Sequence, residues 1–159
     1  MTYIINRVWA MPSGDTFDCK PIGTLVKSYL RHSSVSIDPF ARNKNWATYT
    51  NDLNPNTDAQ HHLDVVDFLN MLINNGVRAD LIIFDPPYSP SQVKELYQNI
   101  GQTFTQQDAQ RTHAWSKEKE LCDQLLEDGG CFLYFGWDSV GMGASRDYSP
   151  IEFLLVWAS

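Results

Sequence analysis

This chain of 159 residues has few cysteines and no long apolar run. Its three cysteines, Cys19, Cys122 and Cys131, are an odd number at wide spacing without a Cys-x-x-Cys pair, which argues against a disulfide framework or a cysteine zinc site. No run of about 18 apolar residues predicts a membrane helix, and Tyr3-Ile4-Ile5 is too short for a signal peptide. The adjacent His61 and His62 lack a third ligand at a useful spacing, so no metal is expected.

Basic residues are also scarce, with 12 Lys and Arg against 19 Asp and Glu and a net charge of −7. Phosphate contacts supply most of the non-specific affinity for nucleic acid, so this balance is an objection to that ligand class. The basic residues do cluster, at Arg42 and Lys44 and at Arg111, His113, Lys117 and Lys119. A basic strip on an acidic body stays open, although for 117–128 alone we prefer a helix with a solvated mixed-charge face.

The composition that remains, 43% hydrophobic and 13% aromatic, predicts one domain over 1–159 with a substantial core. We expect helices over 21–31, 65–73 and most of 91–128, and strands over 35–37, 47–50, 81–84, 131–135 and 151–157, with a short third element ending at 63–64. Strands that alternate with helices imply parallel pairing and right-handed crossovers. The predicted fold is a three-layer α/β sandwich with a mostly parallel sheet.

The most informative stretch is Asp85-Pro86-Pro87-Tyr88, directly after the apolar strand 81–84. Open α/β sheets bind their ligands in crevices at the carboxyl ends of the strands. Two prolines make this turn stiff and remove its backbone donors. A carboxylate, rigid carbonyl acceptors and an aromatic ring suit a planar heterocycle with an exocyclic amine. The alternative is an ordinary Asp-Pro turn with Tyr88 as packing.

Four aspartates, Asp38, Asp52, Asp64 and Asp85, each end one of the expected strands. In a parallel sheet these carboxylates would face one crevice, which suits a ligand with hydroxyls, amines and a positive centre. Asp52 is placed to accept both hydroxyls of a ribose, Asp64 the amine of an adenine, and Asp38 an ammonium group. Each aspartate taken alone is more often a cap or a turn residue.

At these positions the chain resembles the compact, phage-type adenine-specific DNA methyltransferases that use S-adenosylmethionine. The resemblance covers about 17–156, and its most specific part is the catalytic Asp85-Pro86-Pro87-Tyr88 motif. Its other matches are the lysine-proline element Phe17-Asp18-Cys19-Lys20-Pro21, the cofactor loop Asp38-Pro39-Phe40, the ribose segment Asp52-Leu53 and the adenine segment Asp64-Val65.

The resemblance implies a Rossmann-like class I methyltransferase that methylates an exocyclic amine of a DNA base, at N6 of adenine or N4 of cytosine. It implies S-adenosyl-L-methionine as cofactor, single-stranded DNA or DNA with a flipped base as partner, and the cytoplasm of a bacterial or phage-infected host cell as location. Residues 41–45 replace the glycine-rich turn of the family. We expect Asn43 or Asn45 to adopt the left-handed backbone conformation there. We expect no separate target-recognition domain within 1–159, so contacts to DNA are expected within 89–117, at Ser89, Arg111 and Lys117.

The expected sheet apparently lacks the family's last strand, so strand 151–157 should lie beside 131–135 or be covered by a second chain. A homodimer is the simplest form of such cover. Two other functions stay open. One is an RNA or free-base amino methyltransferase, since the motif recognises an amine and not a sugar. The other is a non-catalytic subunit that binds S-adenosylmethionine within a larger assembly.

Overall fold

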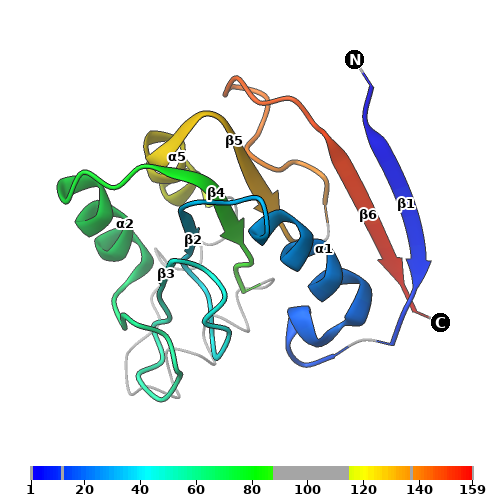
Figure 1. The fold of residues 1–159 in the computed structure, drawn as a ribbon, viewed down its shortest axis with the longest axis horizontal. Coiled ribbons are helices and arrows are strands. Elements are labelled where there is room, and N and C mark those ends of the chain that lie inside the picture. Colours follow the sequence, from blue (N-terminus) through cyan, green and yellow to red (C-terminus); the bar gives the residue numbers. More distant parts are fainter. Residues whose placement is uncertain (1, 12, 88–114, 137, 159) are drawn as a thin grey trace.

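The computed structural model describes residues 2–11, 13–87, 115–136 and 138–158, which form an α/β fold with parallel strands (Figure 1). A four-stranded sheet has the order β3-β2-β4-β5, and β1 pairs with β6 in a two-stranded sheet. All the strand pairs are parallel, as expected. The strands are β1 (Ile4–Trp9), β2 (Ser36–Asp38), β3 (Tyr49–Thr50), β4 (Ala79–Phe84), β5 (Leu126–Tyr134) and β6 (Glu152–Trp157). The helices are η1 (Thr16–Asp18), α1 (Lys20–Leu30), α2 (Val65–Asn74) and α5 (Ser116–Leu125).

The central strand β4 shows how three layers arise from one apolar run. Successive side chains of a strand point to opposite faces of the sheet. Leu81 and Ile83 pack with α1 residues in one core, whereas Ile82 and Phe84 pack with α2 and α5 residues in another. Helices therefore cover both faces, which is why β4 is a nearly continuous apolar run and not an alternating one. The predicted α/β sandwich is confirmed.

Two expected elements differ from the structure. The expected third strand is absent from the described residues, because the chain near 63–64 contributes only an isolated bridge between Asn51 and His61. Asp64 instead begins α2, where its side chain accepts a hydrogen bond from Val66 N–H. The fifth strand pairs regularly with β4 only from Cys131, since the stretch after Leu126 bulges away. Gly129 has φ +80° there, which side chains disfavour.

The sixth strand does not lie where the sequence placed it. It pairs along its length with β1, a segment for which no strand was predicted, and Figure 1 shows the two strands side by side beyond α1. The inner face contacts α1, since Tyr29 Oη donates to Glu152 Oε2 over 3.0 Å. The outer face of this pair is largely apolar and, apart from the half-buried Phe153, exposed. It comprises Tyr3, Ile5, Arg7, Trp9, Ile151, Phe153, Leu155 and Trp157. Neither strand β5 nor a second chain is needed to pair β6.

Candidate functional site

Three carboxylates gather at the carboxyl ends of neighbouring strands. Asp38 ends β2 and Asp85 follows β4, the strand beside it, while Asp52 follows β3 on the other side of β2. All three are buried, with exposed fractions of 1% for Asp38, 3% for Asp85 and 8% for Asp52. Asp38, Asp52 and Asp85 therefore lie at one edge of the sheet, as the sequence predicted. The fourth predicted residue, Asp64, begins α2 and does not end a strand.

The electrostatics of Asp38 reflect this crowding. Burial raises its pKa well above the usual range, and the charges of Asp85 and Asp52 raise it further. The Phe40 N–H, which donates to Asp38 Oδ1 over 3.2 Å, and the Arg42 charge lower that pKa only in part. A buried carboxylate beside two others is unfavourable in the free protein. A cationic or amine-bearing ligand placed among them would relieve the repulsion.

Asp52 joins two loops through backbone hydrogen bonds. Its Oδ2 accepts from Arg42 N–H over 3.0 Å, and its Oδ1 accepts from Asn54 N–H over 2.9 Å. Burial raises its pKa, and these two N–H donors partly offset that effect. Each carboxylate oxygen has two lone pairs, so both oxygens keep the capacity to accept a hydroxyl.

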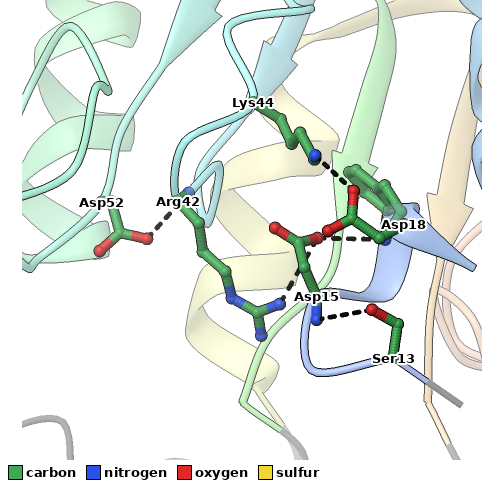
Figure 2. Close-up of polar contacts among 7 residues, drawn as sticks. Ser13, Asp15, Asp18, Arg42, Lys44 and Asp52 are labelled. Atoms are coloured by element: carbon green, nitrogen blue, oxygen red, sulfur yellow. Dashed lines mark hydrogen bonds and ion pairs between the residues drawn. The ribbon is translucent and has the colours of Figure 1, made fainter.

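The loop after β2 is tied to the N-terminal segment by ion pairs (Figure 2). Lys44 Nζ lies 2.6 Å from Asp18 Oδ1, and Arg42 Nη1 lies 3.9 Å from Asp15 Oδ1. Figure 2 shows the loop held between Asp52 on one side and this acidic pair on the other. The charges of Arg42 and Lys44 are therefore matched within the protein, which argues against their share of a basic strip for nucleic acid.

Arg42 also corrects an expectation about the backbone. We expected Asn43 or Asn45 to be left-handed in place of the missing glycines, but the left-handed residue is Arg42, with φ 52°. This conformation is uncommon for a side chain of that size. The hydrogen bond from its N–H to Asp52 and the ion pair between its guanidinium and Asp15 stabilise this conformation.

The lysine-proline element lies against this loop. Phe17 is buried and stacks on Trp46 at a centroid distance of 5.6 Å, so η1 and the loop after β2 share one aromatic contact. A Cβ at Gly23 would lie 2.5 Å from the Phe17 carbonyl oxygen, so α1 approaches η1 closely only because residue 23 is glycine.

Asn51 is the residue of this edge that sequence reasoning missed. It is buried, and its Nδ2 donates to the carbonyls of Pro39 and Leu63, at 3.3 and 3.0 Å, while its Oδ1 accepts from Leu63 N–H at 3.0 Å. Asn51 thereby joins the loop after β2 to the segment that enters α2. An asparagine at a strand end is a common turn residue, so its sequence carries no signal of this role.

Aromatic side chains line the β4–β5 side of the same edge. Phe40 makes edge-to-face contacts with Phe84 and Trp115, both at 5.3 Å. Tyr134, which ends β5, pairs in register with Phe84 and stacks with it at 6.4 Å. These rings pack around Phe84, the residue directly before Asp85, in the core on the α5 side of the sheet. Trp115 and Tyr134 were not singled out from the sequence.

The remaining predicted residues lie in less informative positions. Lys20 and Pro21 begin α1, with Lys20 exposed, and Val65 at the start of α2 is part of the core. Pro39 is buried and Leu53 half-buried. Pro86 is buried beside Asp85, Pro87 is half-buried, and Lys117 is exposed on α5. Tyr88, Ser89 and Arg111 lie outside the described residues.

Comparison with protein-family models, curated proteins and solved structures gives no match for this chain. Among the residues that the structure describes, no three His, Cys, Asp or Glu side chains form a group able to hold a metal ion. No helix in the described part of the chain is both long and apolar enough to cross a bilayer.

Proposed function

We propose that this protein transfers a methyl group from S-adenosylmethionine to an exocyclic amine of a DNA base, at N6 of adenine. The observation that carries the proposal is the placement of Asp85-Pro86-Pro87 at the carboxyl end of β4, one strand from Asp38 and two from Asp52. In open parallel sheets this edge is where nucleotide-like ligands bind. The resemblance to amino methyltransferases supports the proposal independently of this geometry.

The residues present fit the proposed cofactor. Its sulfonium and ammonium groups are cationic, and burial together with the charges of Asp85 and Asp52 raises the pKa of Asp38, an environment that a cationic ligand would relieve. Asp52 has spare acceptor capacity for ribose hydroxyls, and Asp38 is placed for an ammonium group. When bound, S-adenosylmethionine supplies an electrophilic methyl group. Phe17 and Lys20, in and directly after η1, belong to the element expected at its methionine end.

Asp85 and Pro86 are the residues that would act on the target. The lone pair of an exocyclic amine is delocalised into the ring, so the nitrogen is a weak nucleophile while its hydrogens stay in the ring plane. Acceptance of one N–H by the Asp85 carboxylate and of the other by the Pro86 carbonyl would direct the lone pair out of that plane. Asp85 would then take the proton that the methylated nitrogen releases. Orientation of this kind contributes several kcal/mol of barrier lowering.

A duplex target must first leave the base stack, at a cost of a few kcal/mol. Stacking on an aromatic side chain returns about 1–3 kcal/mol per base. Tyr88 was expected to serve in this way, and the half-buried Phe40 and Tyr134, which pack on the residue directly before Asp85, are further candidates.

Two aspartate variants test the division of labour. Asp85→Ala should abolish methyl transfer and leave the affinity for S-adenosylhomocysteine within a few-fold, because Asp85 addresses the target amine. Asp52→Ala should weaken that affinity by about 1–3 kcal/mol through loss of the ribose bonds. Asp58→Ala, on an exposed loop, is the control. Calorimetry measures binding, and thermal unfolding reports any loss of the Asp52 bonds to the loops.

The assignment is wrong if Asp85→Ala loses as much affinity as Asp52→Ala. Incubation of the wild-type protein with radiolabelled cofactor and separate DNA and RNA pools, followed by nucleoside mass spectrometry, identifies the acceptor. Label in RNA or free base alone would select the second methyltransferase function. Cofactor binding without any transfer would select the non-catalytic subunit.

A further inference from the structure

Lys119 is a buried lysine whose ammonium group makes no hydrogen bond and no ion pair within the described part of the chain. Only 6% of it is exposed, and its Nζ lies 4.6 Å from the centroid of the Tyr134 ring. Sequence reasoning preferred a solvated mixed-charge face for this helix, and that expectation is wrong for Lys119 and for the fully buried Glu118. Their burial follows from the packing of α5 on β5 and on the segment around Met142, which the sequence of the helix does not reveal.

This arrangement is unfavourable for the free protein. Burial lowers the pKa of Lys119, and the nearby charge of Arg146 lowers it too, while Asp138 acts in the opposite direction. Taking an ammonium group out of water without a hydrogen-bond acceptor carries a large penalty, which a cation–π contact offsets only in part. Lys27 makes a similar contact with Trp46 at 4.7 Å but is exposed and carries no such penalty.

Lys119 lies on the target side of the candidate site. Tyr134 is the register partner of Phe84, the residue directly before Asp85, and Phe135 N–H donates to the Phe84 carbonyl over 3.1 Å. The sheet order β3-β2-β4-β5 puts Tyr134 on the opposite side of Asp85 from Asp38 and Asp52. The carboxylates thus lie on one side of the catalytic turn and the ammonium group on the other.

A second cation with an unused donor lies nearby. Arg146 donates from Nη1 to the Met142 carbonyl and from Nη2 to the Ser116 carbonyl and Glu120 Oε2. Its Nε is buried and has no hydrogen-bond partner among the residues that the structure describes. Asp138 Oδ2 accepts from Tyr134 Oη and Oδ1 accepts from Val140 N–H, and the Asp138 charge offsets the burial of Lys119 only in part. The region therefore has spare positive donors in a protein whose net charge is −7.

We propose that Lys119 binds a phosphate group of the target nucleotide, with Arg146 reinforcing the positive potential. The inference rests on the proposed function, because it takes the Asp85 turn as the place of the target base. A contact between Lys119 and a phosphate group would make the enzyme bind a nucleotide within a strand more tightly than a free nucleoside. A phosphate fits better than a ring nitrogen, since two neighbouring cations with unused donors favour an anion over a neutral acceptor.

Equilibrium binding tests the inference without any turnover. Binding of 5′-deoxyadenosine monophosphate and of deoxyadenosine is measured by calorimetry, in the presence of S-adenosylhomocysteine, for the wild type, Lys119→Met and Lys27→Met. We expect Lys119→Met to weaken nucleotide binding at least 10-fold and to leave nucleoside binding unchanged. Lys27→Met should match the wild type for both ligands. Inorganic phosphate should compete with the nucleotide for binding to the wild type. It should compete only weakly for binding to Lys119→Met.

Methionine removes the buried charge and keeps the aliphatic stem, so Lys119→Met should fold, and Lys119→Gln is the second variant if it does not. Equal losses for nucleotide and nucleoside would mean a contact to the base, and unchanged nucleotide binding would mean a structural lysine. Equal affinity of the wild type for both ligands would likewise overturn the proposal. Absence of methyl transfer with the expected binding pattern would instead overturn the proposed reaction and leave the phosphate site standing.

Discussion

Replacement of Asp38 by asparagine should make the protein without cofactor more stable and, at the same time, weaken its binding of S-adenosylhomocysteine. Asparagine keeps the acceptor for Phe40 N–H. It removes the carboxylate of a residue that is only 1% exposed and that lies close to the charges of Asp85 and Asp52. The stability gain follows from linkage. A group whose pKa is raised by folding is ionised in the unfolded chain at a pH where the folded chain keeps the proton, so stability falls as pH rises.

The size of the effect is set by one proton. Below the ordinary pKa of an aspartate, near 3.9, both states are protonated and Asp38 contributes nothing. As pH rises from there toward the raised folded pKa, Asp38 lowers the free energy of unfolding by about 1.4 kcal/mol per pH unit. In a domain of this size that corresponds to roughly 3–5 °C of melting temperature per pH unit. Asp38→Asn lacks this slope. The raised pKa of Asp52 acts in the same direction, but it is common to both proteins.

Thermal unfolding followed by circular dichroism, from about pH 4 to pH 7 without cofactor, measures the two slopes. The melting temperature of the wild type should fall more steeply with pH than that of Asp38→Asn, and Asp58→Asn, on an exposed loop, should follow the wild type. Parallel slopes for the wild type and Asp38→Asn would refute the argument that Asp38 is held in an unfavourable charged environment. If Asp38→Asn bound S-adenosylhomocysteine as tightly as the wild type does, the proposed role of the Asp38 carboxylate in cofactor binding would be refuted.

Two further outcomes are expected. Gly23→Ala should lower the free energy of unfolding by about 1–3 kcal/mol in urea titrations, because its Cβ would meet the Phe17 carbonyl oxygen at 2.5 Å. Gly14→Ala, which has open space, should change it little, and equal effects would mean that the approach of α1 to η1 is not tight. We also expect a homodimer in light scattering at micromolar concentration, through the outer face of the β1–β6 pair, where Trp9 and Trp157 are 53% and 58% exposed. Trp9→Lys with Trp157→Lys should then give a monomer, and a wild type that stays monomeric at all concentrations would exclude this interface.

The parts of the fold that the sequence predicted are those set by local patterns. The buried run of β4, the amphipathic helix α1 with proline in its first turn, and the strand-helix alternation all follow from short stretches of chain. The pairing of β6 with β1 joins residues nearly 150 positions apart, and no local pattern specifies such a partner. The expected third strand was wrong for a related reason, since Asp64 is a good helix N-cap and its hydrogen bond to Val66 ends any extended segment.

The candidate site likewise contains residues that local patterns predict and residues that only the tertiary structure reveals. Asp38, Asp52 and Asp85 were predictable because each follows a recognisable strand, and their convergence is a property of parallel sheets. Lys119 was not, because its burial depends on Tyr134 and Arg146, which come from later parts of the chain. Both sets place charge where the free protein is destabilised by it, negative on the β2 side of the Asp85 turn and positive on the β5 side. A fold selected for stability alone would keep neither. The arrangement is the one that the proposed reaction requires, in which a cationic cofactor binds on one side, an anionic nucleotide binds on the other, and the target amine lies between them at Asp85.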